Sequence, residues 1–225
     1  GTGIRKWLSV MNNGLYNGLD NGLHNGVYNG LLDGSKSSVF ENETVVRHKL
    51  ATVGLVLNVD SNNIISYNNG SSRVYDLTLK RNNGTLTNGV SVTNRNVFSF
   101  DGINDYIDFG NDSSLDFGSG NFTASILFRY TNAGSRCTIM NKFYYLGGGT
   151  ENGFYIDILS SGKIRSGFET NASNYSITDS TSFVDNNKVF QATLVRKNNK
   201  ASIYLNGRFE SENTLSVGNV STITS

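Results

Sequence analysis

The chain has 225 residues, of which 37% are hydrophobic and 16% charged, and its formal net charge is +1. This length is enough for one all-β domain or two smaller domains, and both fractions are below the usual globular averages. The near-neutral balance gives no electrostatic basis for a nucleic-acid partner. No apolar run reaches the roughly 18 residues of a membrane-spanning helix, so no membrane is expected either.

The N-terminal region contains a four-residue repeat, NGLYNGLDNGLHNGVYNGLLDG, at residues 13–34. A helix is opposed by its six glycines, each unfavourable by about 1 kcal/mol. An extended strand would place the apolar residues on one face, because four is a multiple of the strand period of two, and successive turns would use the Asn-Gly pairs. We expect an extended or turn-rich arm docked on partner chains, with the helix as the alternative. The assembly residues of this arm are Leu15, Leu19, Leu23, Val27 and Leu31.

From about residue 50 onward, short runs rich in Val, Ile, Phe, Tyr and Thr alternate with turn signals. This texture predicts strands, most of them with period-two alternation. The turns between them carry Asn, Asp or Gly, which tolerate positive φ and close hairpins. The pattern favours an antiparallel sandwich or barrel. The predicted strands are LATVGLVLNV, VFSFDG, DYIDFG, FTASILFRYT, CTIMNKFYYL, GFYIDIL, KIRSGFET, KVFQATLVRK and ASIYLNGRFE.

Residues 55–130 resemble the N-terminal half of laminin G-like domains of the concanavalin A-like lectin/glucanase superfamily. The resemblance is carried by Asp60, Ser66–Tyr67, Asp76–Leu77, NNGTLTNG at 82–89, FDGINDY at 100–106 and FTASILF at 122–128. Later, SGKIRSG and ASIYLNGR are similar to a returning strand and a hairpin of that family. The resemblance implies an all-β, antiparallel jelly-roll sandwich, a fold that hosts lectins, glucanases and structural modules.

The predicted organisation is an N-terminal arm over residues 1–48 and a laminin G-like sandwich over residues 49–225. The closing segment expected from the resemblance is not found after SENTLSVGNVSTITS. Either the last strands come from elsewhere, or the chain stops before the domain is finished. An unclosed sandwich would expose strand edges, which favours pairing with another chain.

The residues predict no catalytic site. Glucanases of this fold need carboxylates spaced along one strand face, about 5 Å apart, and no stretch has that spacing. The two histidines, His24 and His48, lie outside the predicted sandwich, so a Ser-His-Asp triad cannot be assembled within it. We therefore expect a protein that is not an enzyme.

No cofactor is predicted, although the resemblance raises Ca²⁺ at the rim of the sandwich. The metal candidates are Asp101, Asn104 and Asp105 in FDGIND. A turn in which these residues bond their own backbone is the preferred interpretation.

Sugar binding would need exposed aromatic rings beside amide and hydroxyl groups. The candidates for carbohydrate contact are Tyr144, Tyr145, Asn152 and Tyr175. Together with the laminin G-like resemblance, which extends to phage and viral structural proteins, they predict a non-enzymatic virion component: a capsid decoration, fibre or tail-associated subunit at the virion surface. Its expected partners are copies of itself or other virion proteins, and a host glycan. The alternative is a carbohydrate-binding adhesin of a bacterial surface, or a secreted one.

Overall fold

The computed structural model describes residues 6–7, 54–93, 97–131, 134–147, 150–171, 174–185, 187–216 and 218–221, with only the backbone at 6–7, 144–147, 150–151, 171 and 174. Residues 1–12 and 56–225 group into one compact unit, and residues 13–55 into a second. The repeat arm, with Leu15, Leu19, Leu23, Val27 and Leu31, lies outside the described residues. The predicted division at residue 48 stays a prediction.

The regular structure of the described part is β structure apart from one short 3₁₀ helix, and its strands are arranged in four antiparallel sheets. The sheets have the strand orders β1-β8-β9-β10-β11, β14-β13-β12-β7, β2-β3-β6 and β4-β5. One 3₁₀ helix, Ser113–Leu115, begins at the N-cap Asp112. The strands are β1 (Lys6–Trp7), β2 (Arg73–Val74), β3 (Gly84–Thr87), β4 (Ser91–Val92), β5 (Phe98–Ser99), β6 (Tyr106–Asp108), β7 (Phe122–Arg129), β8 (Cys137–Gly147), β9 (Thr150–Ile158), β10 (Lys163–Asn171), β11 (Asn174–Phe183), β12 (Val189–Lys197), β13 (Lys200–Leu205) and β14 (Arg208–Thr214).

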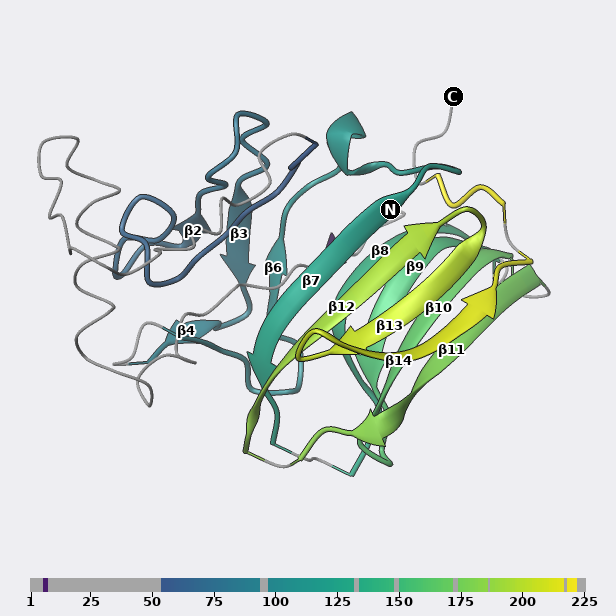
Figure 1. The fold of residues 1–225 in the computed structure, drawn as a ribbon. Coiled ribbons are helices and arrows are strands. Elements are labelled where there is room, and N and C mark those ends of the chain that lie inside the picture. Colours follow the sequence, from purple (N-terminus) through teal and green to yellow (C-terminus); the bar gives the residue numbers. More distant parts are fainter. Residues whose placement is uncertain are drawn as a thin grey trace, which may run out of the picture. The chain divides into compact units, whose positions relative to one another are not determined.

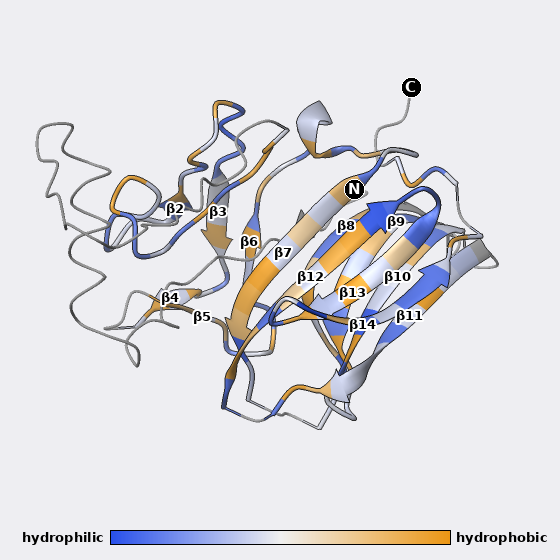
Figure 2. Ribbon diagram, viewed as in Figure 1, coloured by the Kyte–Doolittle hydropathy of each residue, from blue (hydrophilic) through white to orange (hydrophobic). Residues whose placement is uncertain are grey.

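The five-stranded and four-stranded sheets lie face to face (Figure 1). Apolar residues from both sheets meet between them, and hydrophobic and hydrophilic residues alternate along β12 to β14 (Figure 2). A chain of phenylalanine rings joins the layers, with centroids 4.4 Å apart for Phe117 and Phe122 and 4.8 Å apart for Phe122 and Phe154. This arrangement confirms the predicted all-β, antiparallel sandwich.

Tight Asn turns set the register of the four-stranded sheet. The loops β12–β13 and β13–β14 have two central residues each, Asn198–Asn199 and Asn206–Gly207, and all four have positive φ. Two central residues with positive φ are what a type I′ hairpin requires. The turn chemistry expected of Asn and Gly is confirmed at these hairpins, and Asn206–Gly207 divides the predicted strand ASIYLNGRFE into β13 and β14.

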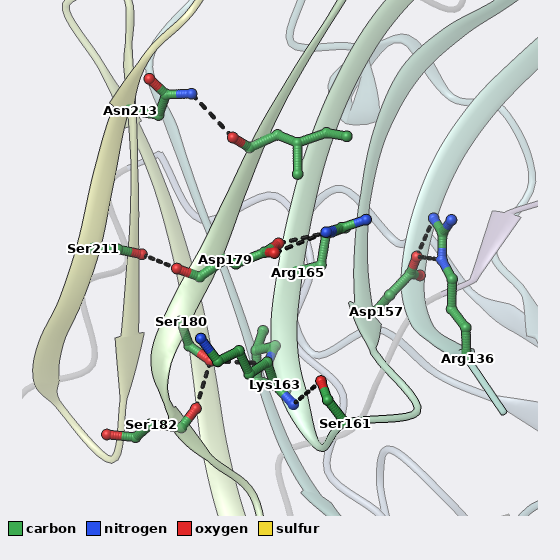
Figure 3. A network of polar contacts seen from close by, with 12 residues as sticks. Arg136, Asp157, Ser161, Lys163, Arg165, Asp179, Ser180, Ser182, Ser211 and Asn213 are labelled. Carbon is green, nitrogen blue, oxygen red and sulfur yellow. Dashed lines mark hydrogen bonds and ion pairs between the residues drawn. The ribbon is translucent and has the colours of Figure 1, made fainter. Parts of the chain in front are cut away.

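Side chains of β14 form hydrogen bonds along the edge of β11. Ser211 Oγ donates to the carbonyl of Asp179 at 2.6 Å, and Asn213 Nδ2 donates to the carbonyl of Ile177 at 3.0 Å (Figure 3). Glu210 accepts from the Thr181 hydroxyl at 2.6 Å. These bonds join one edge of the five-stranded sheet to the edge of the other sheet.

Two buried cations tie loops to the sandwich. Lys142 is 6% exposed; its Nζ donates to the carbonyl of Leu115 and lies 3.6 Å from Asp116 Oδ1. Burial lowers the pKa of Lys142 to about 8, although Asp116 acts in the opposite direction. Arg196, 2% exposed, donates to the carbonyls of Gly118 and Gly218. Both cations thus hold backbone carbonyls of neighbouring loops by hydrogen bonds from buried side chains.

The structure corrects two sequence-based assignments. Residues 54–60 form no strand, contrary to the prediction for LATVGLVLNV, and are held by side-chain contacts such as that of Asn58 N with Asp76 Oδ1 at 2.9 Å. Strand β11 was not predicted, because its core-facing residues are polar: Ser176, Thr178 and Ser180 are all buried. A strand without an apolar face gives no hydrophobic alternation to detect.

Candidate functional site

The face of the five-stranded sheet that is turned away from the four-stranded sheet, here called the distal face, gathers the most varied chemistry. Side chains alternate between the two faces of a strand, and the register between neighbouring strands assigns each residue to one of them. Residues in register with the core-facing Phe154 and Ile156 point inward, and those between them point outward. The distal face is formed by Thr138, Asn141, Phe143, Gly153, Tyr155, Asp157, Arg165, Gly167, Glu169, Tyr175, Ile177 and Asp179.

A row of alternating charges crosses this face. Asp157, Arg165 and Asp179 are in register on β9, β10 and β11, and Arg136, just before β8, completes the row (Figure 3). Two nitrogens of the Arg165 guanidinium donate to the Asp179 carboxylate: Nε to Oδ1 at 2.7 Å and Nη2 to Oδ2 at 2.8 Å. Arg136 donates to Asp157 Oδ2. The bidentate pair fixes the geometry of β10 against β11 more firmly than a single contact would.

Asp157 is the most deeply buried charge of the row. Its side chain is 0% exposed, whereas that of its partner Arg136 is 52% exposed. Burial raises the pKa of Asp157, although Thr138 and Arg136 act in the opposite direction. Oδ1 of Asp157 and Oδ1 of Asn141 are both buried without a hydrogen-bond donor among the described residues. Buried acceptors without donors are unusual. They mark places where a hydroxyl group of a ligand, or a water molecule, could donate a hydrogen bond.

The aromatic ring of Tyr155 lies among these charged residues. Tyr155 is 4% exposed; the guanidinium of Arg136 lies 4.9 Å from the centroid of its ring, and the ring of Phe143 is 5.6 Å away. A methyl group at Gly167 would come within 2.0 Å of Tyr155 Cζ. Glycine is therefore required at position 167 so that the ring can cross β10. Burial raises the pKa of the Tyr155 hydroxyl, which keeps it neutral.

The candidate carbohydrate residues are not all brought together. Tyr175 is 53% exposed on β11 and belongs to the distal face, in register with Glu169. Asn152 is in register with Tyr144 on the opposite, core-facing side, and its Nδ2 donates to the carbonyl of Ser221. The backbone of Tyr144 and Tyr145 belongs to β8, while their side chains lie outside the described part. Of the two candidates whose side chains are described, Tyr175 lies on the distal face and Asn152 does not, and the sugar-contact role of the set stays a prediction.

The metal candidates form the predicted turn. Asp101 Oδ1 accepts from the backbone nitrogen of Ile103 at 2.8 Å, and Asp105 Oδ2 accepts from that of Asp101 at 3.0 Å. The side chain of Asn88 donates to the carbonyl of Asn104 at 2.9 Å. These bonds are the backbone-bonding turn that was preferred for this segment. Within the described residues, no group of three or more His, Cys, Asp or Glu gathers in metal-binding proximity.

Sequence reasoning missed the charge row. Asp157 lies in the predicted strand GFYIDIL without having been a candidate site residue, and Asp179 lies on the strand that was not predicted. The available signal for this strand was the sequence YSITDSTS at residues 175–182, where Ser or Thr recurs at every second position from Ser176 to Ser182. Arg136 lies before its strand, so no periodicity could have placed it opposite Asp157.

Two facing antiparallel sheets with a charged and aromatic outer face define a lectin-like β-sandwich module. A sequence model described as the concanavalin A-like lectin/glucanases superfamily matches residues 100–224, more than half of the chain. The chain therefore belongs to the concanavalin A-like lectin/glucanase superfamily, which confirms the family resemblance.

Among solved structures, the chain is similar to an S-layer domain-containing protein (residues 221–444) from Clostridium thermocellum. The identity is 20% and the TM-score 0.36, with 68% of this chain and 71% of that chain covered. No curated protein matches the chain. Across the described residues, no helix is both long and apolar enough to cross a bilayer.

Proposed function

We propose that this chain is a non-catalytic carbohydrate-binding module of a cell-surface or secreted protein, with its ligand lying across the distal face. The observation that carries the proposal is the half-exposed ring of Tyr175, which is in register with Glu169 on the same face as the charge row. Sugar rings stack on exposed aromatic faces, and their hydroxyls need donors and acceptors at fixed positions. Superfamily membership supports this assignment at the level of the fold, whereas the ligand is inferred from the face itself.

The engagement of the carboxylates supports a binding role over a hydrolytic one. A glycosidase needs one carboxyl as acid and a second as base or nucleophile, both open to the scissile bond. The side chain of Asp157 is buried and paired with Arg136, and the Asp179 carboxylate accepts hydrogen bonds from Nε and Nη2 of Arg165. Glu169 lies on β10, between the strands that carry Asp157 and Asp179. Carboxylates held in ion pairs fix the shape of the face, which suits recognition.

The virion assignment stays a prediction, because superfamily membership is compatible with a virion surface and with a bacterial surface alike. Electron microscopy of the assembled state would distinguish them. A virion subunit should occur in many symmetric copies with residues 13–34 buried between chains.

The binding proposal is tested with the full chain on an array of neutral and acidic polysaccharides, followed by affinity electrophoresis on the best ligand. Tyr175→Ala should weaken binding about three- to tenfold, the worth of one stacked ring. Phe209→Ala is the matched control, because Phe209 is 54% exposed on β14 of the other sheet. An array without any signal, or equal losses in both variants, would overturn the proposal.

A further inference from the structure

A polar hollow of about 370 Å³ lies at one end of the three-stranded sheet, away from the residues of the distal face. Its volume is within the range of roughly 300–1,000 Å³ typical of small-ligand sites. Its walls are the turn that follows β2, the start of β3 and the loop that follows β6. The lining is formed by Arg73, Lys80, Arg81, Asn82, Asn83, Gly84, Thr85, Phe109, Gly110, Asn111 and Asp112.

The turn that forms one wall is fixed by a buried carboxylate. Asp76 is 7% exposed; its Oδ1 accepts from Thr78 N at 3.0 Å, and its Oδ2 accepts from Asn82 N at 2.9 Å. Asn83 Oδ1 accepts in turn from Asp76 N at 3.0 Å. A ring of bonds around one carboxylate holds the backbone of residues 76–83 in a single shape.

The two walls are also bonded to each other. Asn82 is 5% exposed, and its Nδ2 donates to Ser114 Oγ at 2.9 Å and to the carbonyl of Val56 at 2.8 Å. The floor is equally fixed, since a methyl group at Gly84 would lie 2.7 Å from the side chains of Val74 and Ile107. The hollow is therefore preorganised, and a ligand would order little of it on binding.

Three cations line this hollow without carboxylate partners. Arg73, Lys80 and Arg81 are exposed, and none forms an ion pair with a carboxylate among the described residues. The single acidic residue of the lining, Asp112, is engaged as the N-cap of the 3₁₀ helix, accepting from Ser114 N at 2.8 Å. The lining thus carries three positive charges against one negative, while the whole chain is +1.

The backbone is in an uncommon conformation at one of these cations. Arg81 has a φ of 55°, a left-handed conformation that is uncommon outside glycine, and it follows Lys80 directly. Strained non-glycine positions are retained where the surroundings impose them, often at ligand sites. An anion placed among the three cations would relieve their repulsion.

We propose that the hollow binds the anionic groups, carboxylate or sulfate, of an acidic polysaccharide. Hydroxyl and amide groups of Thr85, Asn83 and Asn111 line the same hollow, as the hydroxyls of a sugar require. A nucleic acid fits less well, because the single aromatic residue of the lining, Phe109, is 4% exposed and offers no face for a base. The three cations precede the superfamily match at residues 100–224, whereas the wall formed by residues 109–112 lies within it.

The test measures binding of the full chain to polygalacturonate, to dextran sulfate and to neutral dextran of equal length. The double variant Arg73→Gln/Lys80→Gln removes two charges from the hollow. Lys197→Gln/Arg208→Gln is the matched control, because it removes two exposed charges from β12 and β14. All four side chains are exposed, so both variants should fold, which a melting curve verifies.

We expect binding to at least one acidic polymer and none to neutral dextran. The hollow variant should bind about tenfold more weakly and show a salt dependence reduced by about two charges, whereas the control should change less than about twofold. Preference for polygalacturonate or for dextran sulfate identifies the carboxylate or the sulfate as the ligand group.

Equal losses in the two double variants would reduce the effect to general attraction and overturn the proposal, as would the absence of binding to both acidic polymers. Tighter binding to single-stranded DNA than to either polymer would overturn the ligand class. The loss caused by Arg73→Gln/Lys80→Gln should be the same in a Tyr175→Ala background, because Tyr175 lies on the distal face and does not line the hollow. Failure of this site is thereby distinguished from failure of the proposed function.

Discussion

The contact between Gly167 and Tyr155 gives the sharpest prediction of stability. Replacing Gly167 by Ala adds a methyl group 2.0 Å from Tyr155 Cζ, and Arg136 covers the other side of that ring. Overpacking of this kind is unfavourable by about 1–3 kcal/mol, against a gain of about 0.4–1 kcal/mol from restricting the unfolded chain. We therefore expect a net loss of about 0.5–2 kcal/mol. The Tm should fall by roughly 2–4 °C per kcal/mol in a domain of this size.

A double-mutant cycle measured by urea unfolding isolates the cause. In a Tyr155→Ala background the ring is gone, so Gly167→Ala should become stabilising by about 0.4–1 kcal/mol. Gly218→Ala is the control, because no atom lies within 4 Å of a methyl group there and its φ is not in the left-handed region. A coupling energy below about 0.5 kcal/mol between positions 155 and 167 would refute the reasoning.

Four further predictions concern charged residues. Arg136→Gln should cost about 2–4 kcal/mol at neutral pH, more than Asp157→Asn, because it leaves a buried carboxylate unpaired. Since the pKa of Asp157 is raised in the folded state, the stability of the wild type relative to Asp157→Asn should fall as pH rises above about 4, in denaturation curves taken across that range. The pKa of Lys142 is lowered to about 8, so the unfolded chain binds more protons than the folded chain between about pH 8 and 10. The free energy of unfolding should therefore rise by at most about 3 kcal/mol as the pH increases through this range. Lys142→Met should abolish the rise. Asp76→Asn removes a negative charge near the hollow, yet it should weaken acidic-polymer binding in the electrophoretic assay, because the turn it fixes is lost; tighter binding would favour charge alone.

The sequence predicted those elements whose physics is local. Asn206 and Gly207 close a hairpin because both tolerate positive φ, a property of the residues themselves. Strands such as Phe122–Arg129 and Val189–Lys197 were predicted because their apolar residues face a core. Glycine-rich and Asn-rich turns with hydrophobic alternation between them were therefore sufficient for the fold class.

The site could not be predicted in the same way. The charge row joins Arg136, Asp157, Arg165 and Asp179, which meet only through the register of four strands. The basic hollow likewise depends on how one carboxylate, Asp76, bends its turn. Both are products of tertiary arrangement, and neither has a spacing that a single segment reveals. Tyr175 could be proposed because an aromatic residue among Asn and Ser residues is visible in the sequence, and its sugar-contact role stays a prediction.

The hydrogen bonds that Ser211 and Asn213 donate to β11 affect how copies of this protein can associate. An edge strand with unpaired carbonyls is a template on which a foreign strand can grow, and natural sheets avoid this with charges, bulges or covers. Here the carbonyls of Ile177 and Asp179 are already occupied by side chains of the same chain. Strand-by-strand growth from this edge is thereby blocked, so an assembly of these modules would have to be built through other surfaces.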